Sequence, residues 1–295
     1  MNFLKFLSIR VIILLYNYTH SCINQLINKG SIYQMFKAVT KYTGRFKSLF
    51  EIIFQNMTTA DFTIDKTGMF LERLTTLNLL FSVFLPAENF EEYEFDGDEP
   101  IHVGLGQHIN KEFFKSVKNK DVITMSINKD FIFDFEKNIE TDDCIQSLAV
   151  SFLNTQNITP IKHDVYTSKH VPITHNIYTD WCKSINSSVS NTSSISVTKS
   201  DGQIEFLFDT GRSVKKLLSG KKDKNDIELV HQQFYTEQFT RINKISSFVS
   251  EPIEIRLESN KPLYLLCKSP IGTMKIFMYK IKVEEGNECD LLFNC

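Results

Sequence analysis

The sequence predicts an α+β protein built from two similar halves, with antiparallel sheets and a few short helices. Three observations lead to this prediction. Between Met35 and Val283, a short amphipathic segment precedes alternating strands four times. Glycine-containing turns join the paired strands. A polar stretch without periodicity, which carries Pro160, divides the chain near its middle, as a connector does.

Each amphipathic segment has apolar residues at the i, i+3, i+4, i+7 spacing that buries one face of a helix. We therefore expect helices over Gly44–Asn56, His108–Asn119, Asn176–Ser190 and Thr236–Phe248. Their apolar faces are formed by Phe46, Leu49, Phe50 and Ile53; by Ile109, Phe113, Phe114 and Val117; by Tyr178, Trp181, Ile185 and Val189; and by Phe239, Ile242, Ile245 and Phe248.

After each helix the hydrophobic period changes to two, which is typical of strands. Asp61–Asp65 and Met69–Glu72 flank a turn with Gly68, and Ile195–Thr198 and Gln203–Phe206 flank a turn with Gly202. Glycine there supplies the positive φ that a tight hairpin needs. The other two copies are predicted to pair Val122–Met125 with Phe131–Phe133 and Ile253–Arg256 with Pro262–Leu265.

The pattern divides the chain into a first domain over 35–152, a connector over 153–164 and a second domain over 165–283. Residues 1–34 form an extension whose apolar stretch, Val11–Tyr16, is short and lacks the cleavage site of a secretory signal. We expect either an appended extension with the true start at Met35 rather than Met1, or a short helix or anchor. Residues 284–295 are acidic and indicate a loose tail.

Composition excludes several classes of protein. Lys and Arg number 33 and Asp and Glu 35, a formal net charge of −2, so the chain is no whole-molecule polycation. It has no run of about 18 apolar residues, the length of a membrane-spanning helix. The six cysteines form no C-x-x-C pair, which disfavours a disulfide framework or a zinc site and favours a reducing compartment.

Catalytic motifs are not found in the sequence. It has no P-loop and no G-x-S-x-G, and its histidines follow no metal-ligand spacing. Nothing in these motifs therefore requires an enzyme, and we expect no metal site.

Charge is unevenly distributed along the chain. The four predicted helices together carry +4, which leaves −6 for the remainder, and Lys111, Lys115 and Lys118 form one stripe at i, i+4, i+7. One interpretation is that these lysines lie on ordinary solvated helix faces. The other is a weakly basic surface that faces phosphates without contacting bases.

Several segments point to a known family through their order in the chain. These are Met35–Ala38, Asp61–Leu71, Asn119–Thr124, Asn260–Leu263 and Gly272–Met278. Together with the four-helix repeat, they resemble the sliding clamps of the proliferating cell nuclear antigen (PCNA) type, over nearly all of 35–283. The resemblance implies the DNA-clamp fold: two similar domains per subunit, antiparallel sheets outside, and two helices per domain inside a homotrimeric ring.

The resemblance also implies a function and partners. Such a ring is a processivity factor in DNA replication, not an enzyme, and needs no cofactor. Its partners are duplex DNA irrespective of sequence, copies of itself, a clamp loader, and DNA polymerase or other proteins that carry a clamp-binding peptide, with no membrane. It acts in the nucleus or, for a clamp of a large DNA virus, at a cytoplasmic viral replication site.

The family's functional residues transfer to matching positions of this chain. The implied DNA-facing residues are Arg45, Lys47, Lys111, Lys115, Lys183, Arg241 and Lys244. The implied peptide pocket is lined by Leu74, Phe81, Ile158, Pro160, Pro262 and Phe277. Phe54 and Glu112 depart from basic family positions, and Tyr279 replaces a small residue and a proline at the pocket. The edges that pair between subunits are expected at Cys144–Phe152 and Ser213–Ser219.

Two other functions remain open on the sequence. The chain could be a clamp-fold transcription or scaffold factor that does not encircle DNA. Alternatively, residues 1–34 could anchor an interaction protein to a membrane. Taken singly, each basic residue also fits a solvated face, and each pocket residue also fits core packing.

Overall fold

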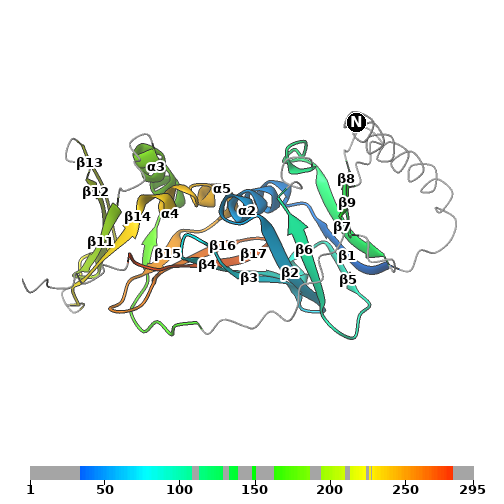
Figure 1. Cartoon of the computed structure of the whole chain (residues 1–295), viewed down its shortest axis with the longest axis horizontal. Helices are drawn as coiled ribbons and strands as arrows, with labels where there is room; N and C mark the ends of the chain where they lie inside the picture. Colours follow the sequence, from blue (N-terminus) through cyan, green and yellow to red (C-terminus); the bar gives the residue numbers. More distant parts are fainter. Residues whose placement is uncertain are drawn as a thin grey trace, which may run out of the picture.

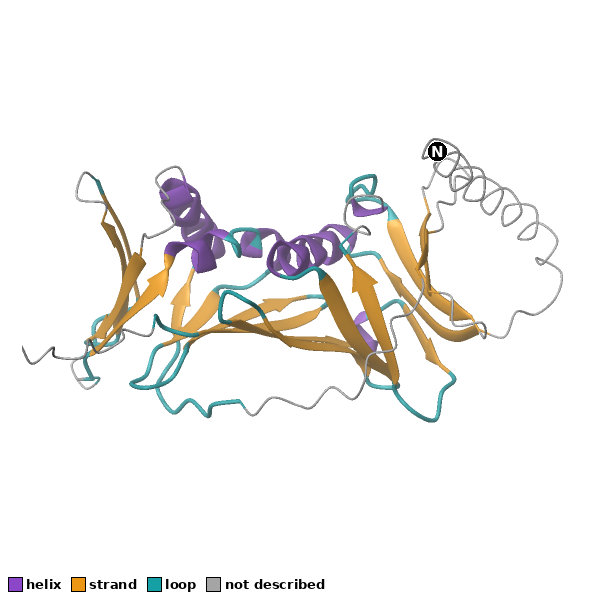
Figure 2. Ribbon diagram, in the orientation of Figure 1, coloured by secondary structure: helices purple, strands orange, loops and turns teal. Residues whose placement is uncertain are grey.

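A computed structural model describes residues 34–107, 113–128, 133–138, 148–150, 163–186, 194–209, 213–223, 226 and 228–281. The described residues form an arc with strands along its length and helices on one side (Figure 1, Figure 2). The helices are α2 (Thr43–Asn56), α3 (His175–Asn186), α4 (Thr236–Thr240), α5 (Ile245–Phe248) and the short 3₁₀ helix η1 (Ala87–Asn89).

Three antiparallel sheets make up the arc. The first has the order β5-β1-β7-β8-β9 and the third the order β13-β12-β11-β14. Between them lies an eight-stranded sheet, β10-β15-β16-β17-β4-β3-β2-β6. The strands are β1 (Gln34–Thr40), β2 (Thr59–Asp65), β3 (Gly68–Leu74), β4 (Leu79–Pro86), β5 (Glu92–Phe95), β6 (Ile101–Gly106), β7 (Val122–Asn128), β8 (Phe133–Asn138), β9 (Leu148–Val150), β10 (Val171–Ile173), β11 (Ser194–Ser200), β12 (Gln203–Asp209), β13 (Val214–Ser219), β14 (Val230–Tyr235), β15 (Ile253–Arg256), β16 (Leu263–Ser269) and β17 (Gly272–Met278).

The middle sheet joins the two halves of the chain. β4 of the first half pairs antiparallel with β17, the last described strand, with Phe81 opposite Ile276 and Leu80 opposite Phe277. Because backbone hydrogen bonds run across this junction, the halves share one continuous ladder rather than touching only through side chains.

Two hairpins form where the sequence predicts them. β2 and β3 meet through Asp65, whose carboxylate accepts hydrogen bonds from the Thr67 N–H at 2.7 Å and the Thr67 hydroxyl at 2.6 Å. β11 and β12 meet through Asp201 and Gly202, with φ of +48° and +75°. Positive φ at both central residues is the turn geometry that matches the twist of paired strands. The α+β prediction, with antiparallel sheets and few helices, is confirmed.

The predicted apolar helix faces are buried wherever they are described, and each half builds a similar aromatic cluster. In the first half, Phe50 stacks on Phe114 with ring centroids 4.8 Å apart. In the second half, Trp181 contacts Phe206 at 5.5 Å and Phe239 at 5.7 Å. Aromatic pairs at this spacing add to the apolar area that each ring buries, so each half has a core of its own beneath its helices.

The helix predicted over Thr236–Phe248 is broken into α4 and α5. In the turn between them, Ile242 N–H donates to Phe239 O and Ile245 N–H to Ile242 O, a tighter i, i+3 pattern. Arg241 O, which would accept from Ile245 in an unbroken helix, accepts instead from the Asn56 side chain at 3.1 Å. A contact from the other half of the chain therefore interrupts this helix.

The helix predicted over His108–Asn119 is also not continuous to its expected end. Residues 108–112 lie outside the described part. From Phe113 onward the chain makes tight turns, with Ser116 N–H donating to Phe113 O and Val117 N–H to Phe114 O. The Asp121 carboxylate accepts from Lys118 N–H at 2.8 Å, which stabilises a turn where helix was predicted.

The first and third predicted helices agree with α2 and, as far as it is described, with α3. α2, with 14 residues, is the longest of the described helices. None of the helices in the described part of the chain is both long and apolar enough to cross a membrane.

Candidate functional site

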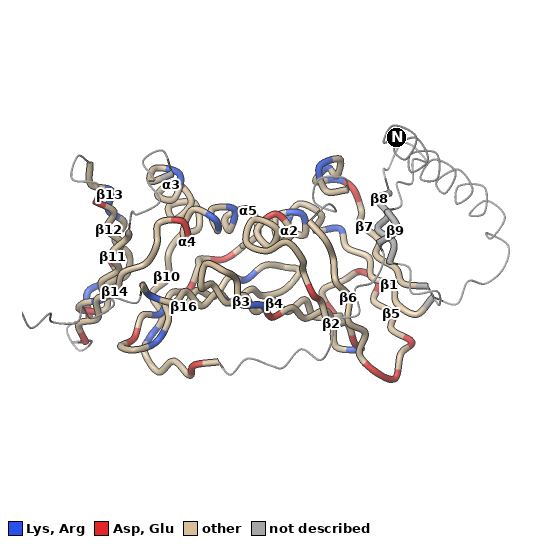
Figure 3. Tube along the Cα trace, viewed as in Figure 1, with Lys and Arg blue, Asp and Glu red and all other residues tan. Residues whose placement is uncertain are grey.

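The predicted DNA-facing cations gather on the helical side of the arc (Figure 3). Lys111 lies outside the described residues. The others are placed as follows: Arg45 and Lys47 on α2, Lys115 in the turn before β7, Lys183 on α3, Arg241 directly after α4, and Lys244 directly before α5. The structure therefore brings six cations from four segments onto one side of the molecule.

Most of these cations already have partners. The Arg45 guanidinium donates to Ser247 O at 3.0 Å and also to Val249 O. The Arg241 guanidinium donates to the Glu237 carboxylate at 2.6 and 2.8 Å and to Gln55 O at 2.6 Å. Both arginines thus bridge backbone carbonyls of the opposite half of the chain.

The lysines are held less firmly. Lys47 donates to Val117 O at 3.1 Å. Lys183 and Lys244 lie 3.7 Å from Asp180 and Glu51, and the two lysine side chains are 68% and 50% exposed. Exposed pairs at this distance contribute little to stability and leave the ammonium groups accessible.

Lys115 and Lys118 are exposed. Within the described ranges, neither ammonium group forms an ion pair. Together with Lys47, Lys183 and Lys244, they are the cations best placed to meet an external anion. The departure at Phe54 is consistent with this arrangement, since that side chain is 3% exposed and packs into the core.

The predicted peptide pocket divides into core and surface. Ile158 and Pro160 lie outside the described residues. Phe81 is fully buried, Phe277 is 3% exposed and Pro262 is also buried, whereas Leu74 is 51% exposed. Leu74 and Tyr279, which is 37% exposed, are therefore accessible from solvent, whereas Phe81 is not.

Tyr166 links the members of this region, although the sequence did not single it out. Its ring stacks on Tyr264 at 5.1 Å and lies 6.3 Å from Phe277, and its hydroxyl donates to Pro262 O at 2.6 Å. Burial raises the pKa of Tyr166 well above its ordinary value, so the hydroxyl stays protonated as a donor.

His163 and Glu258 hold the segment 163–168 on the sheet. His163 Nε2 lies 2.5 Å from the nearly buried carboxylate of Glu72, and its ring packs 4.9 Å from Phe277. Glu258 accepts from the N–H groups of Thr167 at 2.8 Å and Ser168 at 2.6 Å. These bonds join residues about 90 positions apart in the chain, so no local pattern could have indicated them.

The electrostatics of Glu258 follow from those bonds. Burial alone would raise the pKa of its carboxyl, but the hydrogen bonds from Lys261, Ser168 and Thr167 outweigh burial and lower the pKa to about 2. Glu258 is therefore ionised under ordinary conditions and fixes Thr167 and Ser168 against the turn before β16.

The two predicted edges lie at opposite ends of the arc. β9, within the predicted Cys144–Phe152, ends the first sheet, and β13, within Ser213–Ser219, ends the third (Figure 1). On β13, Val214 is 60% and Leu218 50% exposed. The rest of the first predicted edge lies outside the described residues. An edge strand with exposed apolar side chains is a surface suited to pairing.

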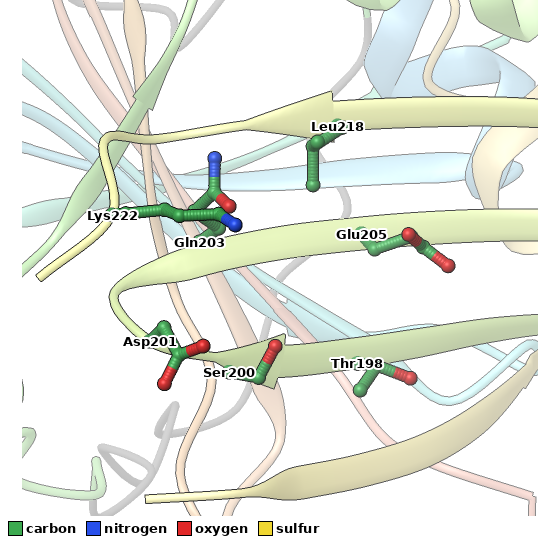
Figure 4. A pocket seen from close by; sticks show the side chains of 7 residues that line it. All are labelled: Thr198, Ser200, Asp201, Gln203, Glu205, Leu218 and Lys222. Carbon is green, nitrogen blue, oxygen red and sulfur yellow. The ribbon is translucent and has the colours of Figure 1, made fainter. Parts of the chain in front are cut away.

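A shallow hollow of about 340 Å³ lies on the third sheet, lined by polar side chains from β11, β12 and the turn after β13 (Figure 4). The lining residues are Thr198, Ser200, Asp201, Gln203, Glu205, Leu218 and Lys222. Except for Asp201 in the β11–β12 turn and Lys222 after β13, they belong to strands whose other face is core.

Comparisons with known proteins agree with this architecture. The family model of the proliferating cell nuclear antigen N-terminal domain matches residues 35–157. A search of curated proteins by sequence found no match. Among solved structures, the proliferating cellular nuclear antigen of Entamoeba histolytica is 12% identical with a TM-score of 0.72, and the match covers 84% of this chain and all of that one. The PCNA2–PCNA3 complex of Sulfolobus tokodaii is also 12% identical, with a TM-score of 0.70 and coverage of 83% and 98%. The fold of this chain is therefore that of PCNA-type clamps, and the sequence of residues 35–157 matches the N-terminal domain of that family.

Proposed function

We propose that the chain is a DNA sliding clamp, a ring-shaped processivity factor that tethers DNA polymerase and other replication proteins to duplex DNA. The observation that carries this proposal is the arrangement of the arc. Helices bearing cations lie on its inner side, and among the described strands β9 and β13, at its two ends, each pair with another strand on one side only. Copies joined edge to edge would enclose a hole lined by helices.

The modest charge of the inner side suits this function. A closed ring stays on DNA because it encircles the duplex. Individual phosphate contacts can therefore be weak and exchange quickly as the ring slides. No bond is made or broken in such a task, so the chain acts as a binding protein rather than an enzyme. The ring is a homotrimer in our proposal, loaded by a clamp loader, and partners dock beside Leu74 through a clamp-binding peptide.

The oligomeric state tests the ring. Light scattering after size exclusion of the full chain is expected to give three times the 34.2 kDa subunit, about 103 kDa. A stable monomer at high concentration would favour the alternative, a clamp-fold transcription or scaffold factor that does not encircle DNA. The domain boundaries, a viral origin and a nuclear or cytoplasmic replication site remain predictions, and imaging of the tagged chain during DNA synthesis would test the location.

The processivity of a DNA polymerase tests whether the chain tethers the polymerase to DNA. The substitution Lys115→Glu reverses an exposed charge on the inner side and is expected to shorten the products of a polymerase assay on primed circular DNA, because it repels phosphates. Lys66→Glu, in the exposed turn between β2 and β3, is the matched control and should leave product length unchanged. Equal shortening by both variants would argue against a DNA-facing role for Lys115.

A further inference from the structure

Two helices from opposite halves of the chain lie against each other at the centre of the inner side. α2 begins beside the end of α5, because Arg45 near its start reaches Ser247 and Val249. α2 ends beside the start of the α4–α5 turn, because Gln55 and Asn56 contact Arg241. The two elements therefore run antiparallel, side by side (Figure 1).

Each element receives an arginine from the other at its C-terminal end. The last carbonyls of a helix have no partner within that helix, and they favour positive charge. Arg45 supplies donors to Ser247 O and Val249 O at the end of α5. Arg241 supplies a donor to Gln55 O, in the last turn of α2. The two contacts are reciprocal caps across the junction of the halves.

Further contacts hold these caps in place. The Glu237 carboxylate binds Arg241 at 2.6 and 2.8 Å and fixes the direction of its guanidinium. The Asn56 side chain donates to Arg241 O at 3.1 Å, and Lys244 lies 3.7 Å from Glu51. Nε, Nη1 and Nη2 of Arg241 all donate within the chain, so this guanidinium has few donors left for a phosphate.

We propose that Arg45 and Arg241 are positioning residues that fix the angle between the two halves of the clamp, and that phosphates are met by the exposed lysines, with Lys115 foremost. This inference rests on the proposed DNA-encircling function for its second part only. It reassigns two of the residues that the family resemblance places among the DNA contacts, because their donors are already committed to carbonyls of the opposite half.

The first experiment uses the salt dependence of DNA binding to distinguish residues that contact phosphates from residues that only hold the two halves together. Binding of the full chain to a fluorescent duplex is measured over a range of salt concentrations, and the slope of log K against log salt is compared among variants. Lys115→Ala is expected to reduce the slope by about 0.9 for each Lys115 of the ring that contacts a phosphate. Arg45→Ala and Arg241→Ala are expected to leave it unchanged. A reduction by either arginine variant as large as that of Lys115→Ala would overturn the reassignment.

Thermal unfolding of the same variants tests whether Arg45 and Arg241 hold the two halves together. Arg45→Ala and Arg241→Ala are expected to lower the unfolding midpoint by about 3–6 °C through loss of charge-assisted hydrogen bonds, and Lys115→Ala to leave it unchanged. Both bonds come from Nη1 of Arg45. Arg45→Lys keeps the charge, but its side chain is one bond shorter and its ammonium does not reach the position of Nη1, so it too should lower the midpoint. An Arg45→Lys variant as stable as the parent chain would contradict the bracing role.

The angle itself needs a separate readout, since a purely local stabilising role would also lower the midpoint. Spin labels on ketone-bearing amino acids at Lys66 and Asp201, in exposed turns of the two halves, report the distance between them. Arg45→Ala and Arg241→Ala are expected to broaden the distance distribution, and Lys115→Ala to preserve it. An unchanged distribution in both arginine variants would refute the fixed angle.

If the parent chain shows no salt-dependent binding to duplex DNA, the proposed function fails. The unfolding and distance measurements still test whether the two arginines fix the angle between the halves.

Discussion

Glu258 shows how one buried carboxylate can organise a segment distant in sequence. It accepts two backbone N–H groups from residues 167 and 168 and a hydrogen bond from Lys261. Lys261 is a local partner, three residues after Glu258. The two N–H donors cannot be inferred from a local motif, because they lie about 90 positions away and meet Glu258 only once the chain has folded. Sequence reasoning therefore identified Pro262 beside this cluster through the family resemblance, but not the acid that holds it.

The depressed pKa of Glu258 predicts an acid-sensitive contribution to stability. The ordinary pKa is 4.5 and the folded value about 2, so the contribution is complete above pH 4.5 and disappears as pH falls towards 2. Glu258→Gln removes the charge. We expect this variant to be less stable than the parent chain at neutral pH, with a difference that shrinks across this window. Urea unfolding from pH 7 to pH 2 measures it, and a constant difference would contradict the assignment.

At the scale of elements, hydrophobic period predicted what each helix buries but not where each one ends. All four apolar sets are buried where they are described, because a 3.6-residue period needs only local sequence. The interruption between α4 and α5 depends on Asn56, 185 residues before Arg241 in the chain. The same holds for the cations. The sequence predicted that they share one side of the molecule, but not which backbone carbonyls accept hydrogen bonds from Arg45 and Arg241.

Two glycines, Gly68 and Gly272, begin the strands that pair with β4 on either side, and they allow a test at the scale of elements. Gly272 has φ of +149°, and a Cβ there would lie 2.2 Å from Phe84 O; Gly68 has φ of +146° and the same conflict with Leu85 O. Gly272→Ala is expected to cost about 3 kcal/mol, because strain and a backbone clash coincide. Gly44→Ala, whose Cβ meets only the end of the Asn119 side chain at 2.9 Å, is the control and should change stability by about 1 kcal/mol or less. Differential scanning calorimetry compares them.

For the whole molecule, the exposed edge at β13 makes a prediction that separates assembly from folding. Leu218 is 50% exposed in the single chain and lies opposite Glu205 of β12, so Leu218→Lys should leave the thermal midpoint of the monomer almost unchanged. If β13 joins the edge of a second copy, an ammonium group there opposes the apolar contact, and the scattering mass should fall from the trimer value to 34.2 kDa. Ser196→Lys, on the interior strand β11, adds the same charge away from the edge and serves as the control. Loss of the trimer in both variants would point to a general weakening of the sheet instead.

The pairing of β4 with β17 has a consequence for how the chain is made. β17 leaves the ribosome roughly 190 residues after β4, about 10–40 s later at ordinary rates of synthesis. During that interval the nascent first half presents an apolar strand, Leu79–Pro86, that pairs with β3 on one side but has no partner yet on the other. The first half can complete its own core, but its edge stays open until translation is nearly complete. A nascent chain stalled before Gly272 should therefore recruit chaperones or aggregate, and release of the finished chain should end that vulnerability.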